Sequence, residues 1–140
     1  MMKIVVDSNR VIASLIKEGT TRKILFDELF EFVAPEFLIQ EVYKYKNRLE
    51  EASGMNEEEL NLLLAIALKQ ITIVARAKYI SYTKELNSVL EDKRDLPYLA
   101  VCLAVQSEGI WTHDTDFLKQ KKVKVFTNKD MLKFVGGQLE

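Results

Sequence analysis

The sequence is poor in the residues from which several kinds of functional site are built. Its 140 residues include one cysteine, Cys102, and one histidine, His113. A framework of disulfides is therefore excluded, and so is a zinc site made of clustered cysteines and histidines. A single cysteine is typical of proteins that work under reducing conditions, so we expect a cytoplasmic protein.

Long hydrophobic runs and an excess of charge are missing too. No apolar run approaches the roughly 20 residues of a membrane-spanning helix, and Asp7 interrupts the only apolar stretch near the N-terminus that could belong to a signal peptide. We expect no association with a membrane. The net charge is -1, so the overall charge does not indicate nucleic-acid binding. An anionic substrate would have to be held by local Lys and Arg side chains or by a metal ion.

The order of the apolar segments predicts an α/β protein with one domain, residues 1–140. Hydrophobic residues make up 48% of the chain, and five glycines and two prolines leave no long linker. Short β-branched runs that alternate with segments of helical periodicity favour a three-layer α/β/α sandwich with a mostly parallel sheet of about five strands. The expected strands are residues 3–6, 32–34, 71–74, 110–112 and 123–126.

Three of the expected helices have boundaries that the structure can test. The apolar spacing predicts one continuous helix over residues 36–51 and another over residues 79–90. A last helix is expected to begin at Asn128 and to end at the glycine pair 136–137, because glycine commonly terminates helices.

Acidic residues follow two of the expected strands. Asp7 ends the first strand, Asp114 and Asp116 follow the strand 110–112, and Asp95 opens the helix before that strand. Because ligands of parallel α/β sheets bind at the carboxyl ends of the strands, these carboxylates are expected to converge there. Taken singly, Asp7, Asp95 and Asp114 could each do no more than cap a helix or turn, which stabilises it by roughly 1 kcal/mol.

Glu41 cannot be explained as a helix cap. It lies on the stripe of its helix that Leu38, Val42 and Tyr45 define, so its carboxylate is expected to be buried. An unpaired buried carboxylate costs several kcal/mol or takes up a proton, so Glu41 needs a partner. The partner could be a basic residue such as Lys3 or Arg10, or a metal ion shared with the other acids.

The acids would form a metal site if they share one pocket. Four carboxylates stay ionised together only when a cation neutralises them, and ligands that are all oxygen select Mg²⁺ or Mn²⁺ over Zn²⁺. His113, beside Asp114, is expected at the surface or the rim of the pocket rather than as a general base. A phosphatase or a phospho-acceptor domain would also place Asp after the first strand, but neither accounts for Glu41.

Four motifs, taken in order, resemble the PIN domain, a metal-dependent nuclease fold, over essentially the whole chain. The first is a strand that ends in Asp, Ser and Asn, KIVVDSN at residues 3–9. The second is a Glu in the helix after the second strand, Glu41. The third is an Asp before an apolar, Ala-rich helix, Asp95, with Asp92 upstream. The last is Thr112, Asp114, Asp116 and Phe117. His113 departs from the small or amide residue that is frequent there.

The resemblance implies a metal-dependent hydrolase of phosphodiester bonds, most closely an endoribonuclease acting on single-stranded RNA, like the small prokaryotic PIN proteins that serve as toxins of toxin–antitoxin pairs. It implies one or two Mg²⁺ or Mn²⁺ ions, a homodimer and an antitoxin partner. The alternative is a non-catalytic PIN-like module that binds RNA or protein. The implied catalytic and metal ligands are Asp7, Glu41, Asp95 and Asp114, with Asp116 as a further metal ligand and Ser8, Asn9, Asp92 and Thr112 as supporting residues.

The sequence does not assign the residues that bind the substrate. Candidate contacts to a phosphate backbone are the basic side chains near the acids, and most such side chains are ordinary solvated ones. They are Lys44, Lys46, Arg48, Lys93, Arg94, Lys119, Lys121, Lys122 and Lys124.

Overall fold

A single parallel sheet organises the molecule. The computed structural model describes residues 1–87 and 93–139. Within them the sheet has the order β3-β2-β1-β4-β5, and every neighbouring pair is parallel. The fold is therefore the predicted α/β arrangement. The strands are β1 (Met2–Val6), β2 (Phe30–Pro35), β3 (Ile71–Val74), β4 (Gly109–Trp111) and β5 (Val125–Phe126).

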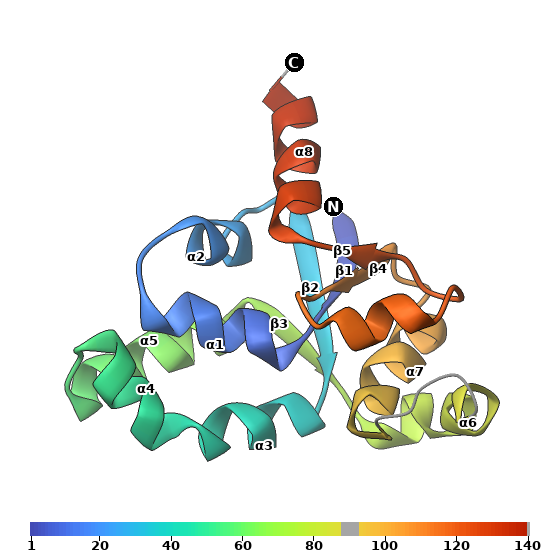
Figure 1. Cartoon of the computed structure of the whole chain (residues 1–140), viewed down its shortest axis with the longest axis horizontal. Coiled ribbons are helices and arrows are strands. Elements are labelled where there is room, and N and C mark those ends of the chain that lie inside the picture. The colour runs from blue at the N-terminus through green and yellow to red at the C-terminus, as the bar shows by residue number, and fades with distance from the viewer. Residues whose placement is uncertain (88–92, 140) are drawn as a thin grey trace.

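Helices cover both faces of the sheet (Figure 1). One side carries α1 (Ser8–Ile16), α2 (Thr20–Leu25), α3 (Phe37–Lys44), α4 (Lys46–Ser53) and α5 (Glu57–Lys69). The other carries α6 (Arg76–Leu86) and α7 (Leu96–Val105), together with the 3-10 helices η1 (Lys93–Asp95) and η2 (Thr115–Lys119). The last helix, α8 (Asn128–Leu139), projects from the body (Figure 1).

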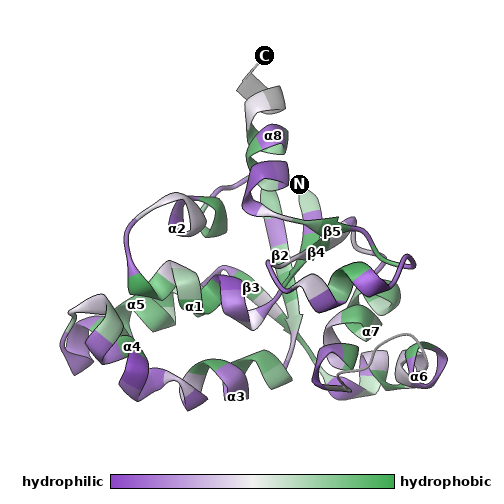
Figure 2. Cartoon of the chain, in the orientation of Figure 1, coloured by the Kyte–Doolittle hydropathy of each residue, from purple (hydrophilic) through white to green (hydrophobic). Residues whose placement is uncertain are grey.

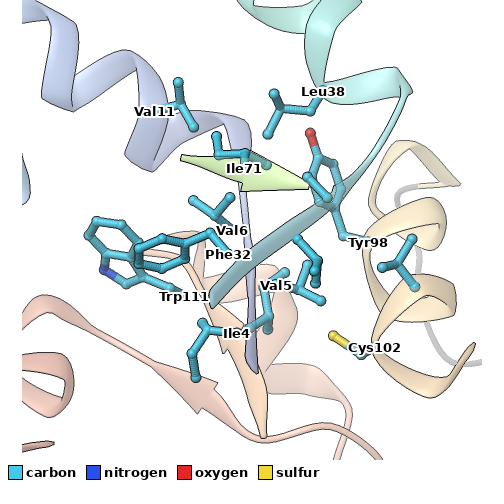
Figure 3. Close-up of a cluster of buried hydrophobic side chains, with 14 of the residues drawn as sticks. Ile4, Val5, Val6, Val11, Phe32, Leu38, Ile71, Tyr98, Cys102 and Trp111 are labelled. Carbon is cyan, nitrogen blue, oxygen red and sulfur yellow. The ribbon is translucent and has the colours of Figure 1, made fainter. Parts of the chain in front are cut away.

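The core lies between the central strands and the helices on either face. Ile4, Val5 and Val6 of β1 are fully buried, because a central strand is covered from both sides. Phe32 of β2 stacks on Trp111 of β4 with ring centroids 5.3 Å apart, and both rings lie beside Val6 (Figure 3). The helices differ in character: α7 is largely hydrophobic, whereas α4 is largely hydrophilic (Figure 2).

Two of the expected helices differ from the prediction. The helix expected over residues 36–51 is two helices, α3 and α4, which meet at Tyr45. Tyr45 donates its N–H to Val42 O rather than to residue 41, so the last turn of α3 tightens and the chain bends there. The helix expected over 79–90 begins three residues earlier, at Arg76. Its expected end, residues 88–90, lies outside the described residues.

Glycines explain two further features of the fold. The last helix runs on through the pair 136–137. Glycine ends a helix where it adopts the left-handed conformation, and among the described glycines only Gly54, with a φ of 72°, does so. At Gly109 an added Cβ would lie 2.6 Å from Lys124 O and 2.7 Å from the Phe126 ring. Only glycine therefore lets β4 and β5 approach this closely.

No helix in the described part of the chain is both long enough and apolar enough to cross a membrane.

Candidate metal centre

The candidate site lies where the strand order reverses. From β1 the chain proceeds outward to β2 and β3, and later to β4 and β5 on the other side of β1. The crevice between the carboxyl ends of β1 and β4 is therefore the switch point of the sheet, where α/β proteins bind ligands. Asp7 follows β1 directly, and its N–H donates to Trp111 O at 3.1 Å, which places it beside Thr112.

Asp7 is a buried carboxylate held by neutral donors. Its side chain is 5% exposed. Its Oδ2 accepts hydrogen bonds from Thr112 Oγ1 at 2.6 Å and from Asn9 Nδ2 at 2.9 Å. Asp7 occupies the N-cap position of α1 but makes no capping hydrogen bond, so capping does not account for this residue.

The pKa of Asp7 reports its surroundings. This pKa is raised from the usual 3.8 to about 6. Burial is the main cause and the negative charges of Glu41 and Asp114 add to it, against the lowering effect of the Thr112 hydrogen bond. The carboxylates of Glu41 and Asp114 therefore lie close enough to Asp7 to repel it.

A chain of hydrogen bonds positions the carboxylates that follow β4. Thr112 is fully buried, and its Oγ1 accepts from the N–H of Asp114 at 3.0 Å. Asp114 Oδ1 accepts in turn from the N–H of Asp116 at 2.9 Å, which caps η2. Asp114 is thus a cap, as the simpler interpretation allowed, and one of its oxygens is used for that purpose. Asp116 also forms an ion pair of 3.4 Å with Lys119.

Glu41 reaches the site from α3 and meets a tyrosine. The half-buried carboxylate accepts a hydrogen bond at Oε1 from the hydroxyl of Tyr98 on α7. The Tyr98 hydroxyl points out of the core toward α3 (Figure 3). Burial first, and then the hydrogen bond and charge of Glu41, raise the pKa of Tyr98, so the phenol stays protonated and remains a donor. Arg10, one of the two basic partners considered for Glu41, donates instead to Asn9 Oδ1 at 3.0 Å.

Three carboxylates come close enough to share one ion. One oxygen each from Asp95, Asp114 and Asp116 lies within 4.8 Å of the others. Asp95 is 9% exposed and sits at the N-cap of α7 without a capping hydrogen bond. Asp7 and Glu41 adjoin this group. We call Asp7, Glu41, Asp95, Asp114 and Asp116 the acidic cluster. Asp92, named with Asp95 in the resemblance, lies outside the described residues.

The comparison with known families agrees with this geometry. The family model of the PIN domain matches residues 5–132. The chain belongs to the PIN domain family. Members of this family are generally nucleases that use divalent metal ions. A search of curated proteins found no match.

The donors of this PIN domain fit a hard divalent cation. Every side chain of the acidic cluster offers carboxylate oxygen, the ligand type that Mg²⁺ and Mn²⁺ prefer. Burial and, to a smaller extent, the charges of Glu41 and Asp114 raise the pKa of Asp7, and a bound cation would relieve the repulsion from these two carboxylates.

Two features of the site escaped sequence reasoning. The first is Tyr98, whose ring is buried, 1% exposed. Only its position three residues after Asp95, at the start of an otherwise apolar helix, could have indicated a role for its hydroxyl. The second feature is Asn128, which accepts from Trp111 Nε1 at 2.8 Å and donates its N–H to His113 Nε2 at 3.0 Å. His113 is exposed at the rim.

Proposed function

We propose that the protein is an endoribonuclease that hydrolyses single-stranded RNA with Mg²⁺ or Mn²⁺. The observation that carries the proposal is the acidic cluster at the switch point of a PIN fold, with Asp7 buried and its pKa raised to about 6. Asp95, Asp114 and Asp116 would hold the metal, with Asp7 and Glu41 completing the set. The metal, when bound, supplies Lewis acidity that activates water and neutralises charge on the scissile phosphate.

The remaining residues act by holding the carboxylates in place. Thr112 and Asn9 fix Oδ2 of Asp7, and Tyr98 fixes Oε1 of Glu41. Hydrogen bonds to ligating carboxylates orient them and keep them in the rotamer that binds. Since these donors are neutral, they position the acids without cancelling the negative charge that attracts a cation.

The test is calorimetric titration of Mn²⁺ together with cleavage of a labelled single-stranded RNA oligonucleotide. The parent protein should bind Mn²⁺ and cut the RNA only when the metal is present. Asp7→Asn and Glu41→Gln should each weaken the binding and remove the cleavage. Binding of RNA by the parent without any metal-dependent cleavage would favour the alternative, a non-catalytic module that binds RNA or protein.

The biological setting forms a second part of the proposal. The resemblance to small prokaryotic PIN proteins supports a toxin whose activity is blocked by an antitoxin, and it supports a homodimer. Sedimentation of the purified protein at tens of micromolar tests the dimer, and a stable monomer would contradict it. Co-purification from the native host tests the antitoxin, and recovery of the protein alone would count against that role.

A further inference from the structure

A groove leads away from the acidic cluster along α3. Its inner part is a hollow of about 170 Å³, lined by Glu41 of the cluster and by Lys44, Tyr45 and Arg94. Its outer part is a hollow of about 600 Å³ between α3 and the starts of α6 and α7. Phe37 and Gln40 line both hollows, so the two are adjacent. We call them together the α3 groove.

The lining of the groove follows from the helical repeat. Phe37, Gln40, Glu41 and Lys44 are spaced 3, 1 and 3 residues apart in α3, and residues at this spacing share one face of a helix. That face begins with an aromatic ring and ends with a cation. The acid between them belongs to the cluster, so the face connects the groove directly to the proposed site of cleavage.

The inner hollow suits a phosphate group that neighbours the one being cut. Lys44 and Arg94 are exposed, and Arg94 immediately precedes Asp95 of the metal-binding group. Nucleic acid carries a negative charge on every nucleotide, and the acidic cluster repels the charges that no metal neutralises. Cations directly beside the cluster therefore provide the attraction that a substrate strand needs there.

The outer hollow suits an unpaired base. Phe37 and Pro97 are half-buried, so each presents part of its apolar surface, and Tyr79 lies behind them with 4% exposure. Glu36 Oε1 accepts the N–H of Arg76 at 3.2 Å, which ties the start of α3 to the start of α6 and fixes this wall. Bases stack on such surfaces only when they are splayed out of a strand, whereas a duplex keeps its bases paired inside.

We infer that the α3 groove binds the single-stranded segment on one side of the cleaved bond, with a phosphate between Lys44 and Arg94 and a base against Phe37 and Pro97. This inference rests on the proposed nuclease function. An acidic protein segment could also meet the two cations, but it would leave the apolar outer hollow without a matching group.

The experiment measures binding separately from cleavage. Asp7→Asn serves as the background, so that the RNA stays intact. Anisotropy of a labelled single-stranded RNA oligonucleotide is followed with Mg²⁺ present, for this background alone, with Lys44→Gln and Arg94→Gln added, and with Lys69→Gln and Lys124→Gln added. The last pair is the matched control, because these exposed lysines lie just before β3 and β5, at the amino ends of the strands. Lys124 was a candidate phosphate contact from the sequence, but this position is at the end of the sheet opposite the acidic cluster.

The groove pair should weaken RNA binding about tenfold, whereas the control pair should change it less than twofold. The slope of log affinity against log salt should fall by roughly 0.7 for the groove pair, because the two cations together hold one phosphate of a single strand. In the protein with Asp7 intact, the groove pair should raise KM and leave kcat nearly unchanged. This result is expected when a mutation removes contacts that stabilise the bound substrate and the transition state equally.

Equal binding by the groove and control pairs would overturn the inference, and so would the absence of saturable binding in the background protein. Duplex RNA bound as tightly as the single strand would overturn the assignment of the outer hollow. These failures are distinct from failure of the proposed function, which is a parent protein that does not cleave RNA or an Asp7→Asn variant that still does.

Discussion

The two ends of the parallel sheet carry hollows of similar size but different chemistry. At the carboxyl ends of the strands, the hollow of about 600 Å³ adjoins the acidic cluster through the α3 groove. At the amino ends, a hollow of about 530 Å³ is lined by residues that include Cys102, Ser107 and Lys122. There Lys122 pairs with Glu85 at 3.9 Å, and Ser107 donates to the carbonyl of Gly109. The volume of a hollow does not by itself identify a functional site. The two ends of the sheet differ instead in the carboxylates that crowd together at one of them.

Helix α7 shows the same contrast along its own length. Tyr98 lies in its first turn and Cys102 lies one turn later. Tyr98 meets the carboxylate of Glu41. Cys102 is 3% exposed, and burial raises the pKa of its thiol to about 12. One helix thus provides a positioning group in its first turn and an inert core residue in the next.

Asp7→Asn should have the largest effect at the carboxyl end. Metal-dependent cleavage should be lost, by more than the 10- to 100-fold typical of groups that only support a ligand. In the metal-free protein at pH 7 the variant should be as stable as the parent or more stable. The substitution removes a buried negative charge that Glu41 and Asp114 repel, and the amide oxygen of Asn can still accept the hydrogen bonds of Thr112 and Asn9. Thermal melting in EDTA measures this, and a large loss of stability would contradict the crowded cluster.

The pH dependence of the parent should show the same buried group. The folded pKa of Asp7, about 6, lies above the usual 3.8, so between these values the folded state holds a proton that the unfolded chain has released. The stability of the metal-free protein should therefore fall as pH rises from about 4 to about 6, by about 3 kcal/mol from this group. Melting curves across this range check it, and Asp7→Asn should lack this component.

Mn²⁺ binding should have the opposite dependence on pH. The proton on Asp7 must leave before its carboxylate can serve a cation, so the affinity should fall about tenfold for each pH unit below 6. Calorimetry at pH 5 and pH 7 measures the change. An affinity that is the same at both values would remove Asp7 from the metal-binding set.

Tyr98→Phe should have an intermediate effect. The ring still fills the core, but Glu41 loses the hydrogen bond that orients it, so Mn²⁺ affinity should fall about tenfold while the far-UV circular dichroism spectrum stays unchanged. The pH profile of Mn²⁺ affinity should keep its midpoint near 6, since Asp7 sets it. Unchanged affinity would show that Glu41 needs no support from α7.

Cys102→Ala, at the amino end, should have the smallest effect on function. Removal of a buried sulfur should cost about 1 kcal/mol of stability, and cleavage should match that of the parent. In the folded parent a thiol reagent should react slowly, and denaturation should restore the ordinary rate. A Cys102→Ala variant with greatly reduced cleavage would undo the contrast between the two ends of the sheet.

The sequence predicted the features that depend on where a residue stands relative to a strand or helix. Asp7 and Asp114 could be placed because parallel strands bring their carboxyl ends together, and the alternation of strands and helices predicted the α/β fold. The division of residues 36–51 into two helices could not be seen, because Leu38, Val42, Tyr45 and Leu49 keep helical spacing across the bend at Tyr45.

The contact between Tyr98 and Glu41 lay beyond the sequence for a different reason. In an apolar helix a tyrosine has the same pattern as a phenylalanine, and which group its hydroxyl meets depends on how α3 packs against α7. The continuation of α8 through Gly136 is a similar case, because glycine permits a helix end without requiring one. Tertiary packing decides the first feature, whereas the space around Gly136 is open, with nothing within 4 Å of an added Cβ.

The hydrogen bond between Asp7 and Thr112 joins residues that are 105 positions apart in the chain. Ribosomes add about 5 to 20 residues per second, and the N-terminal part of a chain can begin to fold first. The acidic cluster nevertheless cannot assemble until β4 has been made and has inserted beside β1. The complete set of carboxylates therefore gathers only after the segment that carries Asp114 and Asp116 has been made and has folded.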